Sequence, residues 1–329
     1  MLTQTELSNL SPQADRALGS VVGALIGDAA GGIFEFMGRP PTLKEAQDAL
    51  DLPGGGVFDL SPGQFTDDGE MTIALLGALA KGKGAYRQEL AALAYCDWEQ
   101  SNPFDIGLAT RAALRVPKAA MTNPKALAKL VCSQALEHNS ASKANGCMMR
   151  ATPLGLAATG CNIKETIEMV TADVVLTHPN KDCIDSTVAY VLALRHLILH
   201  DGDSEGAIEI ANTYLLDSNH LVLGWLNQAI EGNIDPVTKQ IGFVKHGFTL
   251  AFYFLAFQFS FKEAITQTLL MSGDTDTNAC IVGGMIGASV SSKAIPKKSI
   301  QILLCSFTQS FIDRPAQFKA TDLLTKIYQ

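Results

Sequence analysis

Residues 15–32 of the chain read DRALGSVVGALIGDAAGG, and this stretch decides the fold. Its apolar residues recur at the three- to four-residue spacing of an α-helix. A face of the helix without side chains allows another helix to approach closely. The stretch therefore predicts a buried helix in tight contact with a second one. The face is formed by four glycines at four-residue spacing: Gly19, Gly23, Gly27 and Gly31.

Nearly the whole chain repeats this helical period. Turn signals such as Pro53-Gly54-Gly55-Gly56 and Asn123-Pro124 separate the helical segments, and no run of strands stands out. We find no internal repeat and no linker, so we predict a single all-α domain over residues 16–329, preceded by a polar arm at residues 1–15. The predicted helices span residues 15–32, 69–81, 86–100, 106–116, 124–138, 147–159, 163–177, 183–200, 205–216, 218–231, 243–258, 261–271, 276–290 and 298–312.

Composition and charge exclude several classes of protein. With 329 residues, 47% of them hydrophobic, the chain can bury a large core. The net charge of −8, without any Lys/Arg block, argues against a nucleic-acid partner. The longest uncharged apolar run, residues 247–261, is shorter than the roughly 20 residues that cross a bilayer, so it predicts a buried helix and no membrane partner. Seven scattered cysteines and a polar N-terminus without a signal pattern predict reduced thiols in a cytoplasmic protein.

Two short acidic clusters stand before apolar, Gly/Ala-rich helical segments. The first is Thr66-Asp67-Asp68 and the second is Asp274-Thr275-Asp276-Thr277. Each cluster places two carboxylates beside a threonine hydroxyl, and such hard oxygen ligands bind divalent cations. Either cluster alone is equally well explained as a helix cap, because Asp and Thr are favoured N-cap residues. Adjacent carboxylates repel one another unless a cation compensates them, so their occurrence twice predicts a dinuclear metal site.

Further motifs accompany these clusters. They are Gly27-Asp28-Ala29 followed by Glu35, FTDDGEM at 65–71, NGCMMR at 145–150, LTH at 176–178, GFV at 242–244 and GDTDTN at 273–278. In this order, between residues 17 and 312, the motifs resemble the ADP-ribosylglycohydrolase family. The resemblance implies an all-helical enzyme that binds two divalent cations, Mg²⁺ or Mn²⁺. It also implies removal of ADP-ribose from a modified protein, with the N-glycosidic bond to arginine as the expected site of cleavage.

The resemblance assigns roles to Glu35 and to the acidic clusters. Glu35 would position or deprotonate the attacking water. A surface carboxylate is the alternative for Glu35, but its apolar neighbours in the sequence favour burial and function. Asp67 and Asp276 would take part in catalysis through the cations. The implied ligands of the two cations are Thr66, Asp67, Asp68, Asp274, Asp276 and Thr277.

The resemblance places the substrate against a second group of residues. Asp105 would face the guanidinium of arginine, for which a carboxylate is the natural planar partner, although a cap of the helix that follows explains it equally well. Asn145, Gly146 and Cys147, expected at the start of a helix, would bind the diphosphate through free N–H groups, with an ordinary turn as the alternative. His178 would contact ribose or phosphate, or else cap the end of a helix. Phe243 would pack against the substrate.

Other functions compete with this hypothesis. One alternative is a noncatalytic member of the fold that binds ADP-ribose or serves as a structural protein. Another is an immunity protein that neutralises an ADP-ribosylating toxin by hydrolysis, or by occluding the toxin with the arm at residues 1–15. Serine-linked or small-molecule conjugates are alternative substrates, and a dinuclear phosphatase is disfavoured because metal-binding histidine motifs are absent from the sequence. The complete ligand set and Glu35 favour the hydrolase.

Overall fold

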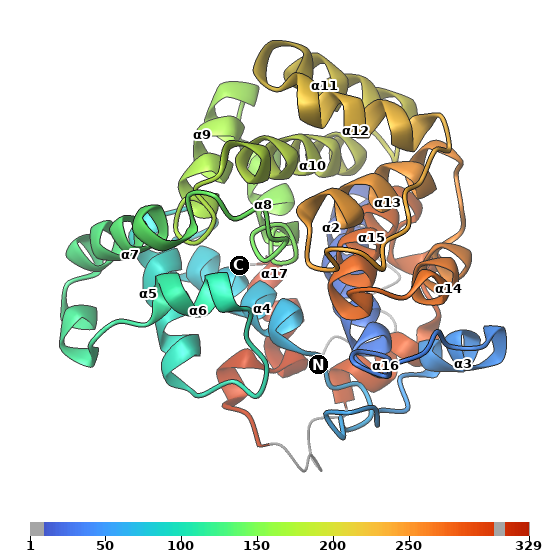
Figure 1. Cartoon of the computed structure of the whole chain (residues 1–329), viewed down its shortest axis with the longest axis horizontal. Coiled ribbons are helices and arrows are strands. Elements are labelled where there is room, and N and C mark those ends of the chain that lie inside the picture. The colour runs from blue at the N-terminus through green and yellow to red at the C-terminus, as the bar shows by residue number, and fades with distance from the viewer. Residues whose placement is uncertain (1–9, 306–312, 329) are drawn as a thin grey trace.

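Most of the chain is helical in the computed structural model, which describes residues 10–305 and 313–328 (Figure 1). The only β contacts in these ranges are isolated bridges that join Gly55 to Leu60 and Ala144 to Phe243, so the all-α prediction is confirmed. The α-helices are α2 (Pro12–Gly31), α3 (Leu43–Asp48), α4 (Asp67–Lys81), α5 (Gln88–Gln100), α6 (Leu108–Leu114), α7 (Pro124–Asn139), α8 (Thr152–Ala157), α9 (Ile163–Val174), α10 (Lys181–Leu199), α11 (Ser204–Ser218), α12 (His220–Ile230), α13 (Val244–Ala256), α14 (Phe261–Met271), α15 (Thr275–Val290), α16 (Lys297–Cys305) and α17 (Leu323–Tyr328).

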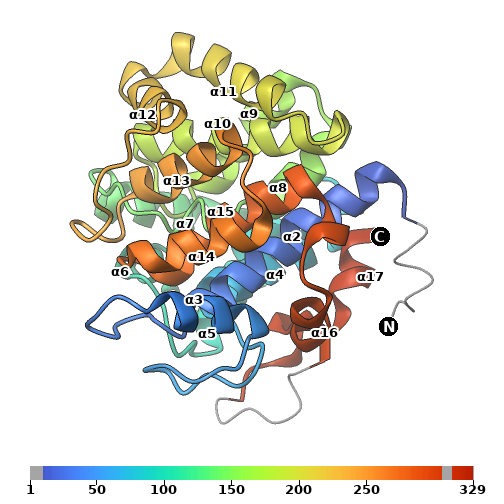
Figure 2. The same ribbon diagram turned by 90° about the vertical axis from the view of Figure 1, so that its right-hand side faces the viewer.

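An antiparallel pair of helices, α2 and α15, forms the centre of the fold (Figure 2). The glycine face of α2 lies directly on the small-residue face of α15. A Cβ added at Gly19 would collide with the backbone of Gly287, and a Cβ added at Gly31 would collide with the backbone of Thr275. The close contact that the glycine spacing predicts is therefore present. The structure adds that the partner of α2 is the helix that follows the second acidic cluster.

The helix α15 is apolar around its whole circumference and is buried on all sides, as expected for a helix at the centre of a large domain. Helices α10, α13 and α14 pack on it beside α2. The α13 helix is itself almost fully buried, which confirms the buried helix predicted from the apolar run at residues 247–261. In the described part of the chain, no helix combines the length and the apolar character that a membrane span requires.

The remaining helices form two sides around this centre. Helices α11 and α12 cover α10 and α13, at the top of Figure 1. Helices α5, α6 and α7 pack on one another and join the centre through α4. All seven cysteines lie in the described ranges and are free.

Some helix ends differ from the predicted ones. The helix expected at residues 147–159 begins only at Thr152, because residues 145–150 form successive turns. The helix expected from residue 106 begins at Leu108. The α2 helix begins at Pro12, inside the predicted polar arm, because Ser11 caps it and proline suits the first turn. Residues 1–9 of the predicted arm and residues 306–312 of the last predicted helix lie outside the described ranges.

Two short helices, α3 and α17, are missing from the prediction. Each contains six residues, too few to display a helical period in the sequence. The α3 helix nevertheless carries a start signal. Thr42 and Glu45 form a reciprocal capping box, in which each side chain accepts a hydrogen bond from the other residue's backbone N–H.

Candidate functional site

The pairing of α2 with α15 sets the position of the second acidic cluster. The C-terminal end of α2 lies against the N-terminal end of α15, where the hydroxyl of Thr275 donates a hydrogen bond to the carbonyl of Gly31 (2.9 Å). Glu35, just beyond α2, accepts a hydrogen bond from the backbone N–H of Thr275 (3.3 Å). The buried Glu35 carboxylate is thereby held at the start of α15.

Asp28 joins the first acidic cluster to the same place. Its carboxylate accepts hydrogen bonds from the backbone N–H and the hydroxyl of Thr66 (both 2.9 Å) and from the backbone N–H of Gly69 (2.6 Å). Asp28 therefore caps the N-terminus of α4 from another helix. The ends of α2, α4 and α15 converge at this point.

The hydroxyl of Thr66 lies at the centre of three carboxylates. Its Oγ1 is 2.9 Å from Asp28 Oδ1, 3.2 Å from Asp68 Oδ2 and 3.2 Å from Asp276 Oδ2. A hydroxyl donates only one hydrogen bond, and Asp28 Oδ1 already accepts from the backbone N–H of Thr66, so the hydroxyl cannot satisfy both Asp68 Oδ2 and Asp276 Oδ2. In addition, the buried Oδ1 of Asp68 has no hydrogen-bond partner in the described residues.

Helix capping does not account for the two clusters. Asp67 and Asp68 lie inside the first turn of α4, and the N-cap residue Thr66 accepts no capping hydrogen bond. Asp274 is the N-cap residue of α15, yet its side chain also makes no capping hydrogen bond. The alternative interpretation from the sequence therefore lacks the hydrogen bonds that define a cap.

The carboxylates form two groups that fit divalent cations. One oxygen from each member of a group lies within 4.8 Å of the others. The unpartnered Asp68 oxygen and the excess of acceptors around Thr66 agree with this fit, because an oxygen-binding cation would satisfy both. The groups are Asp28 with Asp68 and Asp276, and Glu35 with Asp274 and Asp276.

Burial and mutual repulsion raise the pKa of these carboxyl groups. Burial raises the pKa of Asp28 to about 7, against hydrogen bonds from Thr66 that lower it. Burial, followed by the charge of Asp274, raises the pKa of Glu35 to about 7. Burial raises the pKa of Asp67, Asp68 and Asp276 well above the ordinary value, and neighbouring carboxylates raise it further. The raised pKa values mean that burial and mutual repulsion disfavour the charged form of the cluster, which a bound cation would favour.

The clusters open into a cleft of about 370 Å³. Most of the residues predicted from the sequence lie in its wall. They are Glu35, Asp67, Asp105, Asn145, Gly146, His178, Asp274, Asp276 and Thr277. Thr66 and Asp68 are buried beneath this wall. The fold thus brings together residues that are more than 200 positions apart in the chain.

The loop before α6 carries Asp105 into this cleft. The N-cap residue of α6 is Gly107, so Asp105 does not occupy the cap position. Its carboxyl group is half-buried, and burial raises its pKa, followed by the charge of Asp274. The backbone N–H of Gly107 acts to lower the pKa of Asp67, so the loop lies next to the first acidic cluster.

The Asn145-Gly146 segment is fixed by two other parts of the chain. The backbone N–H of Asn145 donates to the carbonyl of Gly242 (3.0 Å), and the Asn145 amide donates to Asp274 (2.8 Å). The segment is a turn and not the start of a helix, so the predicted helix N-terminus at this position is wrong. Asn145 and Gly146 nevertheless line the cleft.

A buried network behind the cleft was not predicted from the sequence. Arg150 is fully buried and forms an ion pair with Asp173 (3.2 Å). Its guanidinium also donates to the carbonyl of Gly146 (2.9 Å) and to the hydroxyl of Thr177 (2.8 Å). Thr177 in turn contacts Nδ1 of His178 (2.8 Å). One arginine thus holds both the Gly146 turn and the His178 ring, and its place in the NGCMMR motif was the only signal.

The side chains of two predicted substrate-binding residues, Cys147 and Phe243, do not line the cleft. The predicted contact of Cys147 is through its backbone N–H group, so the position of its thiol does not test that prediction. The thiol of Cys147 is buried and lies 3.5 Å from the hydroxyl of Thr187. The ring of Phe243 packs edge-on against Trp225, with 5.3 Å between the ring centroids. The two residues before Phe243 in the chain, Ile241 and Gly242, line the cleft instead.

These features define an all-helical protein with a buried cleft built from carboxylates, an arrangement suited to divalent cations. The chain belongs to the ADP-ribosylglycohydrolase family, whose model matches residues 9–322. It is therefore an ADP-ribosylglycohydrolase.

Three relatives match most of the chain. A putative ADP-ribosyl glycohydrolase of Acanthamoeba polyphaga mimivirus is 29% identical over 91% of this chain and 94% of its own length. The ADP-ribosyl-dinitrogen reductase glycohydrolase of Rhodospirillum rubrum is 27% identical, with 86% and 88% covered. The ADP-ribosylarginine hydrolase Tri1 of Pseudomonas putida is also 27% identical, with 98% and 85% covered.

A solved structure has the same fold. It is described as an ADP-ribosylglycohydrolase-related protein complex and superposes with a TM-score of 0.71 at 23% identity. The match covers 97% of this chain and 99% of the other.

Proposed function

We propose that this enzyme removes ADP-ribose from arginine side chains of modified proteins by hydrolysing the N-glycosidic bond, with two divalent cations, Mg²⁺ or Mn²⁺, as cofactors. The observation that supports arginine is the position of Asp105 in the cleft, beside the acidic clusters. A half-buried carboxylate there suits a guanidinium. Two relatives are named for arginine or dinitrogen reductase substrates, each at 27% identity.

The acidic clusters provide the proposed cation site. The cations supply Lewis acidity and orientation of the substrate hydroxyls. Asp28 hydrogen-bonds to the backbone around Thr66 and keeps the first cluster in place. The residues proposed to hold the cations are Thr66, Asp67, Asp68, Asp274, Asp276 and Thr277.

The reaction breaks the bond between the ribose carbon and the guanidine nitrogen. The oxygen of water joins the ribose carbon, and Glu35 takes the proton of that water. Glu35 is buried in the cleft wall beside Asp274 and Asp276, where a carboxylate can accept a proton from an adjacent water. The departing guanidine then takes up a proton, and arginine regains its positive charge. In this scheme Asp105 orients the guanidine, and the Asn145-Gly146 turn and His178 hold the ADP-ribose.

The test is release of ADP-ribose from an arginine-ADP-ribosylated protein, measured with Mg²⁺, with Mn²⁺ and with EDTA. A serine-ADP-ribosylated protein serves as the parallel substrate. We expect release from the arginine-linked substrate only, and only with a cation. Release in EDTA would overturn the cation requirement, and release from serine alone would overturn the arginine assignment.

A further inference from the structure

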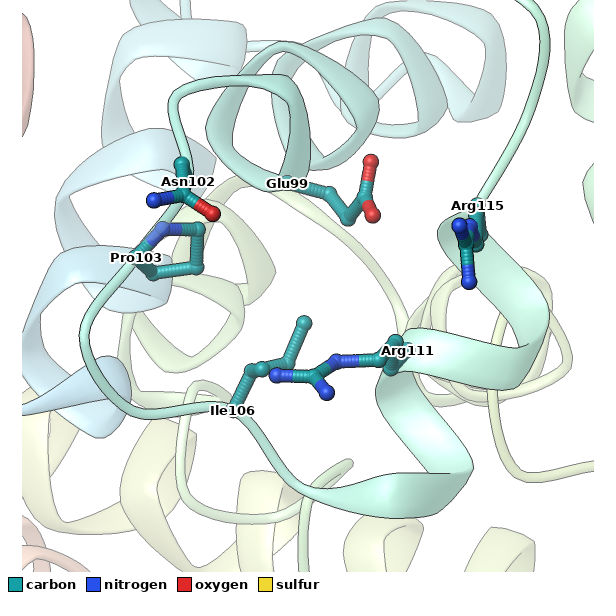
Figure 3. Close-up of a pocket in the computed structure, with 6 residues that line it drawn as sticks. All are labelled: Glu99, Asn102, Pro103, Ile106, Arg111 and Arg115. Atoms are coloured by element: carbon teal, nitrogen blue, oxygen red, sulfur yellow. The ribbon is translucent and has the colours of Figure 1, made fainter.

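A second pocket lies beside the cleft and shares a wall with it. The loop at residues 102–107 contributes Asp105 and Gly107 to the cleft and other residues to the second pocket. Figure 3 shows Glu99, from the end of α5, Arg111 of α6 and Arg115, the residue after α6, around the same hollow. The volume of this pocket is about 260 Å³. The pocket is lined by Glu99, Asn102, Pro103, Ile106, Arg111 and Arg115.

The two arginines of this pocket form no ion pair within the part of the chain that the structure describes, although the charge of Arg111 acts to lower the pKa of Asp105, which burial raises. In the described ranges, neither Arg111 nor Arg115 makes a side-chain hydrogen bond or an ion pair. Other exposed arginines of the chain are paired: Arg39 contacts Glu45 and Arg87 contacts Glu89, at 2.6 Å and 2.7 Å. The absence of partners therefore distinguishes this pocket from the rest of the described arginine-bearing surface.

The charges of the side chains that line the pocket indicate which ligands it can bind. Glu99 is the only acidic residue in the lining. Asp105, on which the charge of Arg111 also acts, lies on the cleft side of the loop and is the proposed partner of the substrate guanidinium, so with substrate bound two positive charges face one negative charge. A guanidinium binds a carboxylate through two parallel hydrogen bonds. The pocket is therefore complementary to one additional carboxylate.

The mouth of the cleft exposes apolar side chains. Phe36, Leu108 and Ile241 all line the cleft, yet their exposed fractions are 62%, 85% and 42%. Exposed apolar side chains that lie together on a protein surface mark a site of contact with another macromolecule. We call these three side chains the rim. A free nucleotide or amino acid inside the cleft would leave most of the rim exposed to water.

The rim is held in a fixed arrangement and reaches the loop between the pockets. The ring of Phe36 contacts Phe58 edge-on, with centroids 5.8 Å apart, and Phe58 contacts Phe104 of the loop, at 5.4 Å. Phe36 also has a left-handed backbone, with φ 57°, a conformation that is unfavourable for a bulky residue. The aromatic contacts thus keep an exposed ring at the mouth of the cleft and extend the apolar band to the loop that separates the two pockets.

We infer that the rim and the second pocket form a docking surface for the ADP-ribosylated protein, in which an acidic side chain near the modified arginine pairs with Arg111 and Arg115. This inference rests on the proposed function, because it assumes that an arginine of a polypeptide enters the cleft. The polypeptide around that arginine must cross the rim, and the second pocket is adjacent to the rim across the loop at residues 102–107.

The experiment compares two arginine-ADP-ribosylated peptides of equal length. One carries Asp or Glu on both sides of the modified arginine, and the other carries Asn or Gln at the same positions. Free ADP-ribosyl-arginine is the third substrate. The variant is Arg111→Gln with Arg115→Gln. The matched control is Lys125→Gln with Lys129→Gln. These two lysines are exposed, lie in the neighbouring helix α7 and are four residues apart, as the two arginines are.

We expect the native enzyme to prefer the acidic peptide by about tenfold in kcat/KM, mainly through KM, the size of effect that one charge-assisted hydrogen-bonded pair gives. The arginine variant should bring this ratio to about one, and the lysine control should keep it. The ratio does not depend on the basal rate, so a general loss of activity does not imitate the result.

A ratio of about one in the native enzyme, or a ratio that survives in the arginine variant, would overturn the docking surface while cleavage of free ADP-ribosyl-arginine still supported the proposed function. Failure of the native enzyme to cleave any of the three substrates would instead overturn the proposed function, and the docking surface with it.

Discussion

The hydroxyl of Thr177 lies 2.8 Å from Nδ1 of His178. Arg150 donates a hydrogen bond to the same hydroxyl oxygen, so the proton of the hydroxyl is directed to Nδ1. Burial, followed by the charge of Arg150, lowers the pKa of His178 to about 3, and the ring is neutral near pH 7. The ring proton therefore resides on Nε2, which lies close to Gly146 in the cleft.

This arrangement makes Thr177 a positioning residue for His178. Thr177→Val removes the hydroxyl and should reduce kcat/KM about tenfold, the value of one well-placed hydrogen bond. Thr177→Ser keeps the hydroxyl and should retain activity. The nitrogen chemical shifts of the His178 ring, measured by NMR, report the position of the proton directly. Equal activity and equal ring shifts in the valine variant would contradict the assignment.

The contact between α2 and α15 predicts opposite effects of two alanine substitutions. Gly23→Ala places a Cβ against the backbone of Gly283 and should lower the free energy of unfolding by about 1–3 kcal/mol or more. Gly77→Ala, in α4, meets no atom within 4 Å and should raise the free energy of unfolding by up to about 1 kcal/mol. Urea denaturation of both variants measures the difference. Equal stabilities would show that the two helices are farther apart than described.

The acidic cluster should contribute to activity and not to the stability of the cation-free fold. Asp276→Asn keeps the shape of the side chain but removes one of several crowded charges. We expect turnover to fall at least about 100-fold, while the melting temperature in EDTA stays the same or rises because repulsion decreases. Asp217→Asn, an exposed position on α11, is the control. A variant that melted lower in EDTA and kept its turnover would restore the helix-cap interpretation.

Removal of the cation should make stability depend on pH in a defined direction. The pKa values of Asp28 and Glu35 are raised to about 7 from the ordinary 3.8 and 4.5, so the folded state binds protons more tightly than the unfolded chain does. The stability from these protons is complete below the ordinary values and is lost as the pH rises through about 7. Mg²⁺ or Mn²⁺ replaces the protons, so the rise in melting temperature on cation addition should be larger at about pH 8 than at about pH 5.5. Calorimetry in EDTA and in excess cation tests this, and a larger rise at the lower pH would refute it.

The local motifs that form the site could be predicted from the sequence better than the contacts between distant motifs. Glycines at four-residue spacing predicted close helix packing on the face that carries Gly19, because that signal is local. It did not predict that the partner of this face is α15, since many small-residue faces fit one another. Thr66 and Asp276, which approach within 3.2 Å, come together only through that pairing.

Long-range polar contacts were the least predictable part. Asp28 caps a helix that begins 39 residues later in the chain (67 − 28), and no local pattern marks such a partner. Arg150 resembles any charged residue in the sequence, and only complete burial beside Asp173 reveals its function. Cys147 follows two cleft residues, yet its side chain is directed into the core because the segment turns and does not continue as a helix.

The position of Asp105 distinguishes substrate recognition from helix capping. Its carboxyl group lies in the cleft wall, and α6 begins only at Leu108. Asp105→Asn keeps the size and an acceptor oxygen but removes the charge that would pair with guanidinium. We expect kcat/KM for arginine-linked ADP-ribose to fall about 100-fold, within the range for loss of one partner of a buried charge pair, while the melting temperature and its rise with Mg²⁺ remain. Asn is as good a helix cap as Asp, so a cap at this position would leave both activity and stability unchanged in the variant. Retained activity would therefore remove Asp105 from the substrate site.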